Sequence, residues 1–176
     1  MTYNKTVLLT GSDGFTGIHL LKSLEREKFN IFSLKSDLLD YDSICEEIKE
    51  IEPDYVIHLA AISFSNDKDS SLIYRTNILG TENLLNALSK HNKNLKKIIL
   101  ASSASIYGNQ NSSPLKESSE IFPINHYGIS KFGMEQISQN YGNLPIIIAR
   151  PFNYTGKLQS NRFLIPKIVN AFKNKE

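Results

Sequence analysis

The chain has 176 residues, 40% of them hydrophobic and 22% charged, with 20 basic and 18 acidic side chains. This length and composition are typical of one globular domain with a buried core and argue against a disordered chain. The near balance of charge gives little support to a nucleic-acid surface, and the single cysteine, Cys45, excludes a disulfide framework.

Two further features predict the location of the protein. The amino-terminal sequence MTYNKTVLLTGSDG has no basic segment followed by an apolar core, and no stretch approaches the roughly 18 apolar residues of a membrane span. Cys45 occupies an apolar position of a helical pattern, which predicts a buried thiol in a reducing compartment. We therefore expect a cytoplasmic protein that is neither exported nor inserted in a membrane.

Short apolar runs alternate along the chain with longer amphipathic segments. The runs are nearly continuous in Val, Ile and Leu, which predicts strands buried on both faces of a parallel sheet. They cover residues 5–10, 30–34, 54–60, 96–102 and 144–150. Helix-length segments lie at residues 15–28, 41–51, 70–91 and 127–141, and another begins near Phe163.

Five alternations of strand and helix, joined by right-handed crossovers, predict a doubly wound parallel α/β sheet of the Rossmann type. We expect the strand order 3-2-1-4-5 and a ligand at the carboxyl ends of the strands, beside the point where the order reverses. The residues that follow each strand are therefore the predicted site.

Three glycines follow the first predicted strand and open the first predicted helix. Gly11, Gly14 and Gly17 are spaced G-x-x-G-x-x-G, whereas the commoner dinucleotide fingerprint is G-x-G-x-x-G. Glycine here permits a tight turn and a close approach of backbone N–H groups to a pyrophosphate, which a helix N-terminus also attracts. In this strand-turn-helix context the loop predicts dinucleotide binding.

The end of the second predicted strand bears on the choice of dinucleotide. An acidic residue there binds the adenosine ribose of NAD, whereas a basic residue accommodates the 2′-phosphate of NADP. The strand ends Ser33-Leu34-Lys35, without a carboxylate, so NADP(H) is favoured and NAD(H) is the alternative. Lys35 also suits a solvated turn, and Asp37 suits either a bond to the adenine amine or the start of a turn.

Tyr127 and Lys131 lie four positions apart in the predicted helix 127–141. Helical geometry places side chains at this spacing on one face, so the phenol and the ammonium are neighbours. In isolation the same spacing is more often a surface tyrosine beside a solvated lysine. The rest of the chain decides between these interpretations.

At these residues the chain resembles the extended short-chain dehydrogenases/reductases of the NAD-dependent epimerase/dehydratase family, which act mostly on nucleotide-activated sugars. The resemblance spans essentially the whole chain, in order and at compatible spacing. It rests on the motifs TGSDGFTG (10–17), DLLD (37–40), VIHLAA (56–61), TNILGTENLL (76–85), SSASIYG (102–108), YGISK (127–131) and RPFNYTG (150–156).

The resemblance implies a full set of site residues. The cofactor contacts, to which Lys35 is added, are Gly11, Gly14, Phe15, Thr16 and Gly17 at the pyrophosphate, Asp37 and Leu38 at the adenine, Leu59, Ala60 and Ala61 at the ribose, and Asn77, Tyr127, Lys131 and Pro151. The catalytic group is Ser103, Tyr127 and Lys131, and the substrate contacts are Ser105 and Asn153. No metal site is expected. Asn77 and the serines also suit helix packing and turns, and His58 and His126 suit structural hydrogen bonds.

The implied catalytic group suits the reduction of a ketone, which needs a hydride and a proton. An ammonium near a phenol favours the phenolate, so Lys131 is predicted to lower the pKa of Tyr127 from its usual value near 10. Ser103 would donate a hydrogen bond to the reacting oxygen.

Relatives that remove water from the sugar carry acidic residues where Ala104 and Ser105 stand here, so dehydration is disfavoured. Reduction of a 4-keto-6-deoxy sugar nucleotide is the favoured interpretation, since residues 149–166 look most like reductases of the GDP-4-keto-6-deoxymannose type. A sugar-nucleotide 4-epimerase, which uses the same serine, tyrosine and lysine, is the alternative.

Members of this family continue with a small carboxyl-terminal substrate domain. Residues 1–176 are therefore interpreted as a dinucleotide-binding domain, the amino-terminal portion of a longer protein. The alternative is a module that binds a dinucleotide without turnover. Relatives form a two-fold dimer through the helices that correspond to 70–91 and 127–141, so a homodimer is expected by resemblance.

Overall fold

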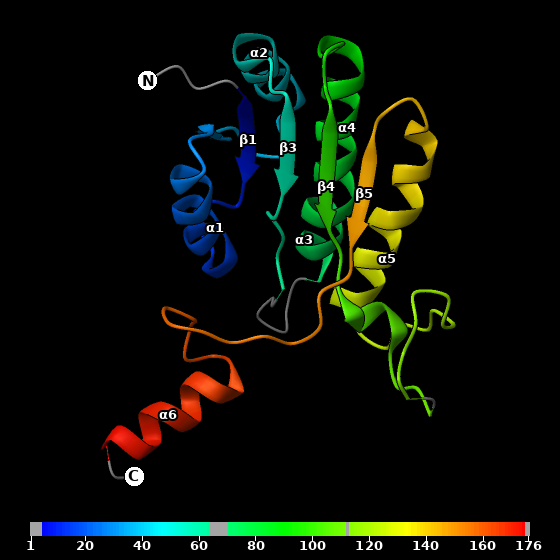
Figure 1. The fold of residues 1–176 in the computed structure, drawn as a ribbon. Helices are drawn as coiled ribbons and strands as arrows, with labels where there is room; N and C mark the ends of the chain where they lie inside the picture. Colours follow the sequence, from blue (N-terminus) through cyan, green and yellow to red (C-terminus); the bar gives the residue numbers. More distant parts are fainter. Residues whose placement is uncertain (1–4, 64–69, 112, 175–176) are drawn as a thin grey trace.

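A computed structural model describes residues 5–63, 70–111 and 113–174 of the chain. A five-stranded sheet forms its centre, with helices on both faces (Figure 1). The strands are β1 (Thr6–Thr10), β2 (Asn30–Ser33), β3 (Tyr55–His58), β4 (Lys97–Ala101) and β5 (Ile146–Ala149). Each lies within a predicted run, and every neighbouring pair is parallel, which confirms the Rossmann-like α/β class.

The helical segments also follow the prediction, apart from a short 3₁₀ turn at residues 104–107 that was not predicted. They are α1 (Phe15–Arg26), α2 (Tyr41–Ile51), α3 (Ser71–Tyr74), η1 (Arg75–Leu79), α4 (Gly80–His91), η2 (Ala104–Tyr107), α5 (His126–Ser138), η3 (Gln139–Tyr141) and α6 (Leu164–Asn174). The predicted helix 70–91 is continuous but changes its winding, because η1 is a π-helical turn between α3 and α4. Across the described residues, none of the helices combines the length and the apolarity needed to cross a membrane.

The local sequence sets both ends of α2. Asp40 caps its N-terminus, because its carboxylate accepts the N–H of Ser43 at 3.2 Å and the Ser43 hydroxyl at 2.7 Å. Glu52 ends the helix in the left-handed conformation, with a φ of 43°, and Pro53 follows as predicted.

The strand order is β2-β1-β3-β4-β5, so the predicted order 3-2-1-4-5 was wrong. After β2 the chain crosses back over β1, and α2 packs against α4. The apolar stripe of α2, Ile44 and Ile48, is thereby buried in one cluster with Leu84 and Leu88 of α4. Right-handed crossovers permit both orders, so handedness alone did not distinguish them. The order now reverses between β1 and β3, beside the glycine loop.

The core lies between α2, α4, α5 and one face of the sheet. Its fully buried members include Leu8, Val56, Ile98, Leu100 and Met134. Cys45 is buried in the same cluster, as predicted.

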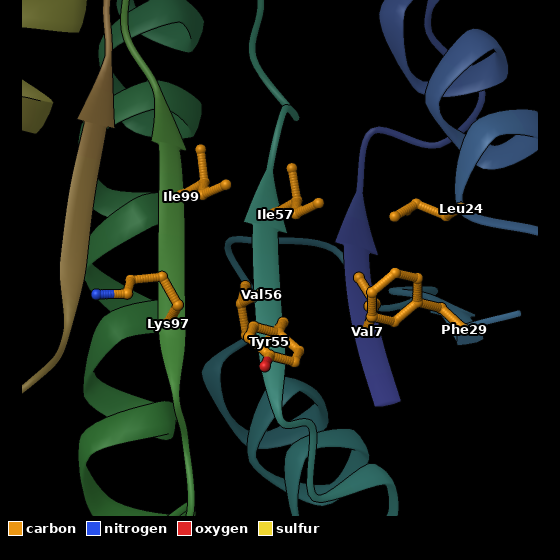
Figure 2. A pocket seen from close by; sticks show the side chains of 8 residues that line it. All are labelled: Val7, Leu24, Phe29, Tyr55, Val56, Ile57, Lys97 and Ile99. Carbon is orange, nitrogen blue, oxygen red and sulfur yellow. The ribbon is translucent and has the colours of Figure 1, made fainter. Parts of the chain in front are cut away.

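The opposite face of the sheet carries α1 and an apolar groove of about 280 Å³. Val7, Ile57 and Ile99 lie on this face, and Leu24 of α1 and Phe29 form one side of the groove (Figure 2). The groove runs along the strands and not at their carboxyl ends, so it is separate from the predicted site. α6 lies apart from the sheet in Figure 1, and its apolar side chains are exposed.

Candidate active site

The glycine loop occupies the carboxyl end of β1 and leads into α1. Gly11 has a φ of +68°, and a Cβ there would lie 2.7 Å from the backbone nitrogen of Ala60. A Cβ at Gly17 would overlap the carbonyl oxygen of Gly11, so both positions require glycine. Gly14 is the N-cap of α1 and makes no side-chain capping bond. The positive end of the helix dipole therefore faces this loop, an arrangement that binds phosphate groups.

The chain that follows β5 returns across the N-terminus of α1 (Figure 1). The rings of Phe15 and Tyr154 stack with centroids 5.8 Å apart, and the hydroxyls of Thr16 and Tyr154 share a hydrogen bond. His19 Nε2 donates to the carbonyl of Lys157 at 2.8 Å. The first and last motifs of the sequence are thus brought together at one edge of the sheet.

β3 ends in a buried histidine that connects two neighbouring elements. His58 Nδ1 lies 2.7 Å from Thr10 Oγ1, and His58 Nε2 lies 2.9 Å from Thr81 Oγ1. Thr81 donates its own proton to the carbonyl of Asn77, so Nε2 of His58 donates and Nδ1 accepts. Thr10 Oγ1 in turn accepts the N–H of Ala60 at 3.1 Å. His58 is thus a hydrogen-bonded structural group, as the sequence favoured.

Asn77 lies in the π-helical turn and binds the loop that follows β3. Its side-chain amide accepts the N–H of Ile62 at 2.8 Å and donates to the Ile62 carbonyl at 3.0 Å. It also donates to Ser130 Oγ at 2.9 Å, and the Ser130 hydroxyl donates to the carbonyl of Tyr127 at 2.8 Å. Asn77 therefore couples the predicted ribose loop to α5.

Asp37 and Leu38 shape the turn that follows β2. Asp37 Oδ1 accepts the N–H of Leu39 at 2.9 Å, which is the behaviour of a turn former. Leu38 is almost fully buried and belongs to the core cluster, and its carbonyl accepts a bond from Asn83 Nδ2 at 2.9 Å. Lys35 is exposed at the start of this turn.

A carboxylate does stand at the end of β2, although the local sequence places none there. Glu47 of α2 accepts the N–H of Lys35 at 3.1 Å, the N–H of Ser36 at 2.7 Å and the Ser36 hydroxyl. The prediction of a strand end without a carboxylate was therefore wrong in three dimensions. No spacing rule pointed to Glu47, which lies 11 and 12 residues beyond its partners.

The predicted catalytic side chains lie together at the ends of β4 and α5. The phenol of Tyr127 is hydrogen-bonded to the side chain of Ser103. Lys131 Nζ lies 5.9 Å from the centroid of the Tyr127 ring, as the one-turn spacing predicts. Ser103 Oγ donates to Ser105 Oγ at 3.1 Å and accepts the Ser105 N–H at 3.1 Å. The structure therefore places these four side chains in one cluster.

Burial sets the protonation of this cluster. Desolvation raises the pKa of Tyr127, while the hydrogen bond with the Ser103 side chain lowers it in part and the nearby Tyr154 raises it further. Desolvation lowers the pKa of Lys131 to about 8, and its ammonium donates to the carbonyl of Ala101 at 2.7 Å. The predicted lowering of the Tyr127 pKa by Lys131 was therefore wrong for this structure, because desolvation is the largest influence on the phenol and raises its pKa.

A partly buried ion pair connects the end of β5 with α5 and η2, which surround the cluster. Arg150, just after β5, donates to both carboxylate oxygens of Glu135 on α5, from Nε at 3.0 Å and from Nη2 at 2.7 Å. Its Nη1 donates to the hydroxyl of Tyr107 at 2.9 Å and to the carbonyl of Glu117. The sequence motifs did not predict this pair. Its signals were an arginine at the end of a strand and an acid one helical turn beyond Lys131.

The other predicted residues lie in loops at the carboxyl edge of the sheet. The loop after β3 carries Leu59, Ala60 and Ala61, and the segment after β5 carries Pro151 and Asn153. The carbonyl of Pro151 accepts the N–H of Ala104, whereas Asn153 is exposed. Within the part of the chain that the structure describes, no group of histidine, cysteine and acidic side chains forms a metal site.

The family model for GDP-mannose 4,6 dehydratase matches residues 16–176. The chain belongs to the NAD-dependent epimerase/dehydratase family of extended short-chain dehydrogenases/reductases. The predicted resemblance to this family is confirmed.

Other members of the family are similar over most of this chain. The GDP-6-deoxy-D-talose 4-dehydrogenase of Aggregatibacter actinomycetemcomitans is 36% identical and aligns with 97% of this chain and 60% of its own length. RMD from Pseudomonas aeruginosa, solved in complex with NADPH, has a TM-score of 0.85 and 30% identity over 97% of this chain and 61% of its own. The UDP-glucose 4-epimerase from Brucella ovis, solved with NAD, has a TM-score of 0.79 and 28% identity over 86% of this chain and 53% of its own. The chain thus spans between 53% and 61% of the length of these family members.

We predict that the two ion pairs found among the described residues differ in their contribution to stability. Arg150→Met leaves the Glu135 carboxylate, which is 3% exposed, buried without its partner, and should lower the free energy of unfolding by about 3 kcal/mol. Lys96→Met breaks the exposed pair with Asp54 and should cost far less. Urea unfolding of both variants measures the difference. An equal decrease in the free energy of unfolding in both variants would show that the Arg150–Glu135 pair contributes no more to stability than the exposed pair.

A second prediction concerns the pH dependence of stability. Lys131 has a pKa of about 8 in the folded chain and 10.5 as its ordinary value, so the unfolded chain binds more protons between these values. The free energy of unfolding should therefore rise as the pH increases from about 8 to about 10.5, and Lys131→Met should remove this increment. The exposed Lys97→Met serves as the control. A Lys131→Met variant with the pH slope of the unsubstituted chain would refute the assignment.

Proposed function

We propose that this chain is the cofactor-binding part of an NAD(P)-dependent oxidoreductase that reduces a 4-keto-6-deoxy sugar nucleotide. The observation that carries the proposal is the cluster of Ser103, Tyr127 and Lys131 at the sheet edge that also bears the glycine loop. The similar enzyme from Aggregatibacter actinomycetemcomitans, by its name, acts at position 4 of a GDP-6-deoxy sugar, which supports the substrate class.

The proposed roles follow from the protonation of the cluster. A bound nicotinamide dinucleotide would supply the hydride. Tyr127 would hold a proton for the reacting oxygen, because its raised pKa keeps the phenol protonated at neutral pH. Lys131 would stabilise the phenolate that remains after the proton has left. Ser103 would donate a hydrogen bond to the same oxygen as negative charge develops there.

The glycine loop suits a dinucleotide, since glycine at positions 11 and 17 lets the loop turn tightly against the neighbouring backbone and the dipole of α1 favours phosphate. The exposed ammonium of Lys35 at the end of β2 supports NADP(H), with NAD(H) as the alternative. Family members have been solved with each of the two cofactors.

A 4-epimerase is the second proposed function, because it would use the same serine, tyrosine and lysine. The UDP-glucose 4-epimerase from Brucella ovis is similar in structure to this chain and supports the alternative. Ala104 and Ser105 provide no acid for the removal of water, which disfavours dehydration. Stoichiometry separates the two functions: a reductase consumes one NADPH for each sugar, whereas an epimerase interconverts sugars without net consumption.

We predict that Tyr127→Phe in the full gene product abolishes oxidation of NADPH by a 4-keto-6-deoxy sugar nucleotide and leaves the Kd of the dinucleotide nearly unchanged. The substitution removes only the proton donor. Tyr141→Phe, which removes a phenol in η3 beyond the far end of α5, is the matched control and should retain turnover. Unchanged turnover in Tyr127→Phe would refute the catalytic assignment. Binding of a dinucleotide without turnover of any nucleotide sugar by the unsubstituted protein would favour a non-catalytic module.

We also propose a cytoplasmic homodimer that pairs through the helical segments 70–91 and 127–141. Leu72, Leu79 and Ile129 are more than 40% exposed on these segments, which supports an apolar contact. Ile129→Glu should shift the protein from dimer to monomer in sedimentation velocity, because it places a charge in the contact. The exposed Ile147→Glu on β5, outside these helices, is the control. A monomeric unsubstituted protein would contradict the proposal.

A further inference from the structure

The carboxylate of Glu47 occupies the hydrogen-bond donors of the turn that follows β2. Its Oε1 accepts both the N–H and the hydroxyl of Ser36, and its Oε2 accepts the N–H of Lys35. Hydrogen bonds of this kind, in which a charged oxygen accepts, are stronger than neutral ones. The hydrogen-bond donors of this turn are therefore already occupied by a negatively charged carboxylate from α2.

This turn is the place where a dinucleotide fold distinguishes its two cofactors. The adenosine ribose lies at the end of the second strand, and a 2′-phosphate there needs donors and positive charge. Backbone N–H groups of a turn and a serine hydroxyl are the donors that bind phosphate oxygens. Here those of Lys35 and Ser36 are taken by Glu47.

The charges in this turn act in opposite directions. The ammonium of Lys35 would attract a 2′-phosphate bound at this turn. The carboxylate of Glu47, whose side chain is partly buried, would lie close to the same phosphate and repel it. Among the residues that the structure describes, the ion pairs are Lys96–Asp54 and Arg150–Glu135. Within that part of the chain, then, no basic side chain at salt-bridge distance neutralises Glu47. A 2′-phosphate would have to displace Glu47 from its donors or lie beside its charge, and both are unfavourable.

We infer that Glu47 is a specificity-determining residue, which weakens the binding of NADP(H) relative to NAD(H) and so opposes the preference proposed for Lys35. The inference rests on the proposed dinucleotide site. Glu47 stands where the dinucleotide fingerprint has an acidic residue, but it arrives from the following helix instead of from the strand. If Glu47 only held the turn against α2, its substitution would change the affinities for NADPH and NADH equally. The ratio of the two affinities therefore distinguishes a structural role from a role in specificity.

The test is the direct binding of NADPH and NADH to the full gene product, with each Kd measured by fluorescence titration. Glu47→Gln keeps the shape of the side chain and one acceptor for Ser36 but removes the charge. It should tighten the binding of NADPH by about tenfold and leave the Kd of NADH within about twofold. Glu46→Gln, one residue earlier on the exposed face of α2, removes the same charge outside the turn and should leave both Kd values unchanged. Lys35→Gln should shift the ratio in the opposite direction.

The dependence on salt provides a second readout, since repulsion between charges is screened and a structural tie is not. The gain in NADPH affinity of Glu47→Gln should shrink as the ionic strength rises from about 0.05 M to about 0.5 M. Glu47→Ala is the second neutral variant if Glu47→Gln folds poorly, and it should change the ratio in the same direction. An unchanged ratio in folded neutral variants, or an equal loss for both cofactors, would overturn the inference. Failure of the unsubstituted protein to bind either dinucleotide would instead overturn the proposed site and the inference with it.

Discussion

The site depends on a buried hydrogen-bonded chain that runs across the ends of β1 and β3. The N–H of Ala60 donates to Thr10, whose hydroxyl donates to His58, and the imidazole donates to Thr81. Each proton has one direction in which it can point, because Thr81 is committed to the carbonyl of Asn77. A buried polar group that loses its hydrogen-bond partner costs about 1–3 kcal/mol, so breaking one of these hydrogen bonds is unfavourable and the network stays intact as a unit. It holds Ala60 in the close contact with the glycine loop that the +68° φ of Gly11 permits.

The same network of hydrogen bonds continues to α5, the helix that carries Tyr127. The side-chain amide of Asn77 binds both backbone groups of Ile62 and then Ser130, which binds the carbonyl of Tyr127. The π-helical turn around Asn77 widens the helix at this point, and such turns occur often at functional sites. The loop that would carry the ribose and the helix that carries the phenol are therefore positioned by one network. A change in either end is transmitted through buried hydrogen bonds and not through solvent.

Periodicity predicted the five strands and the helices well, because runs such as those of β1 and β4 have no other way to bury their apolar side chains. The predicted strand order was wrong, because it depends on the packing of the apolar stripe of α2 against α4. This is a tertiary contact that periodicity along the chain does not reveal. The cluster of Ser103, Tyr127 and Lys131 followed from motifs, but its protonation did not, because desolvation depends on everything that surrounds a group. Glu47 and Glu135 escaped prediction for the same reason: their partners lie on other elements, and only folding makes them neighbours.

The neutral state of His58 matters for the charge of the site. Burial, with a smaller contribution from the positive charge of Lys131, lowers the pKa of His58 to about 3. A protonated imidazole would place a second buried cation in the field of Lys131, whose own pKa burial has already lowered to about 8. The direction of the hydrogen bonds also disfavours this, because Nδ1 of His58 accepts the proton of the Thr10 hydroxyl. At neutral pH the uncharged His58 therefore adds no second positive charge to that of Lys131, whose ammonium lies 5.9 Å from the centroid of the Tyr127 ring.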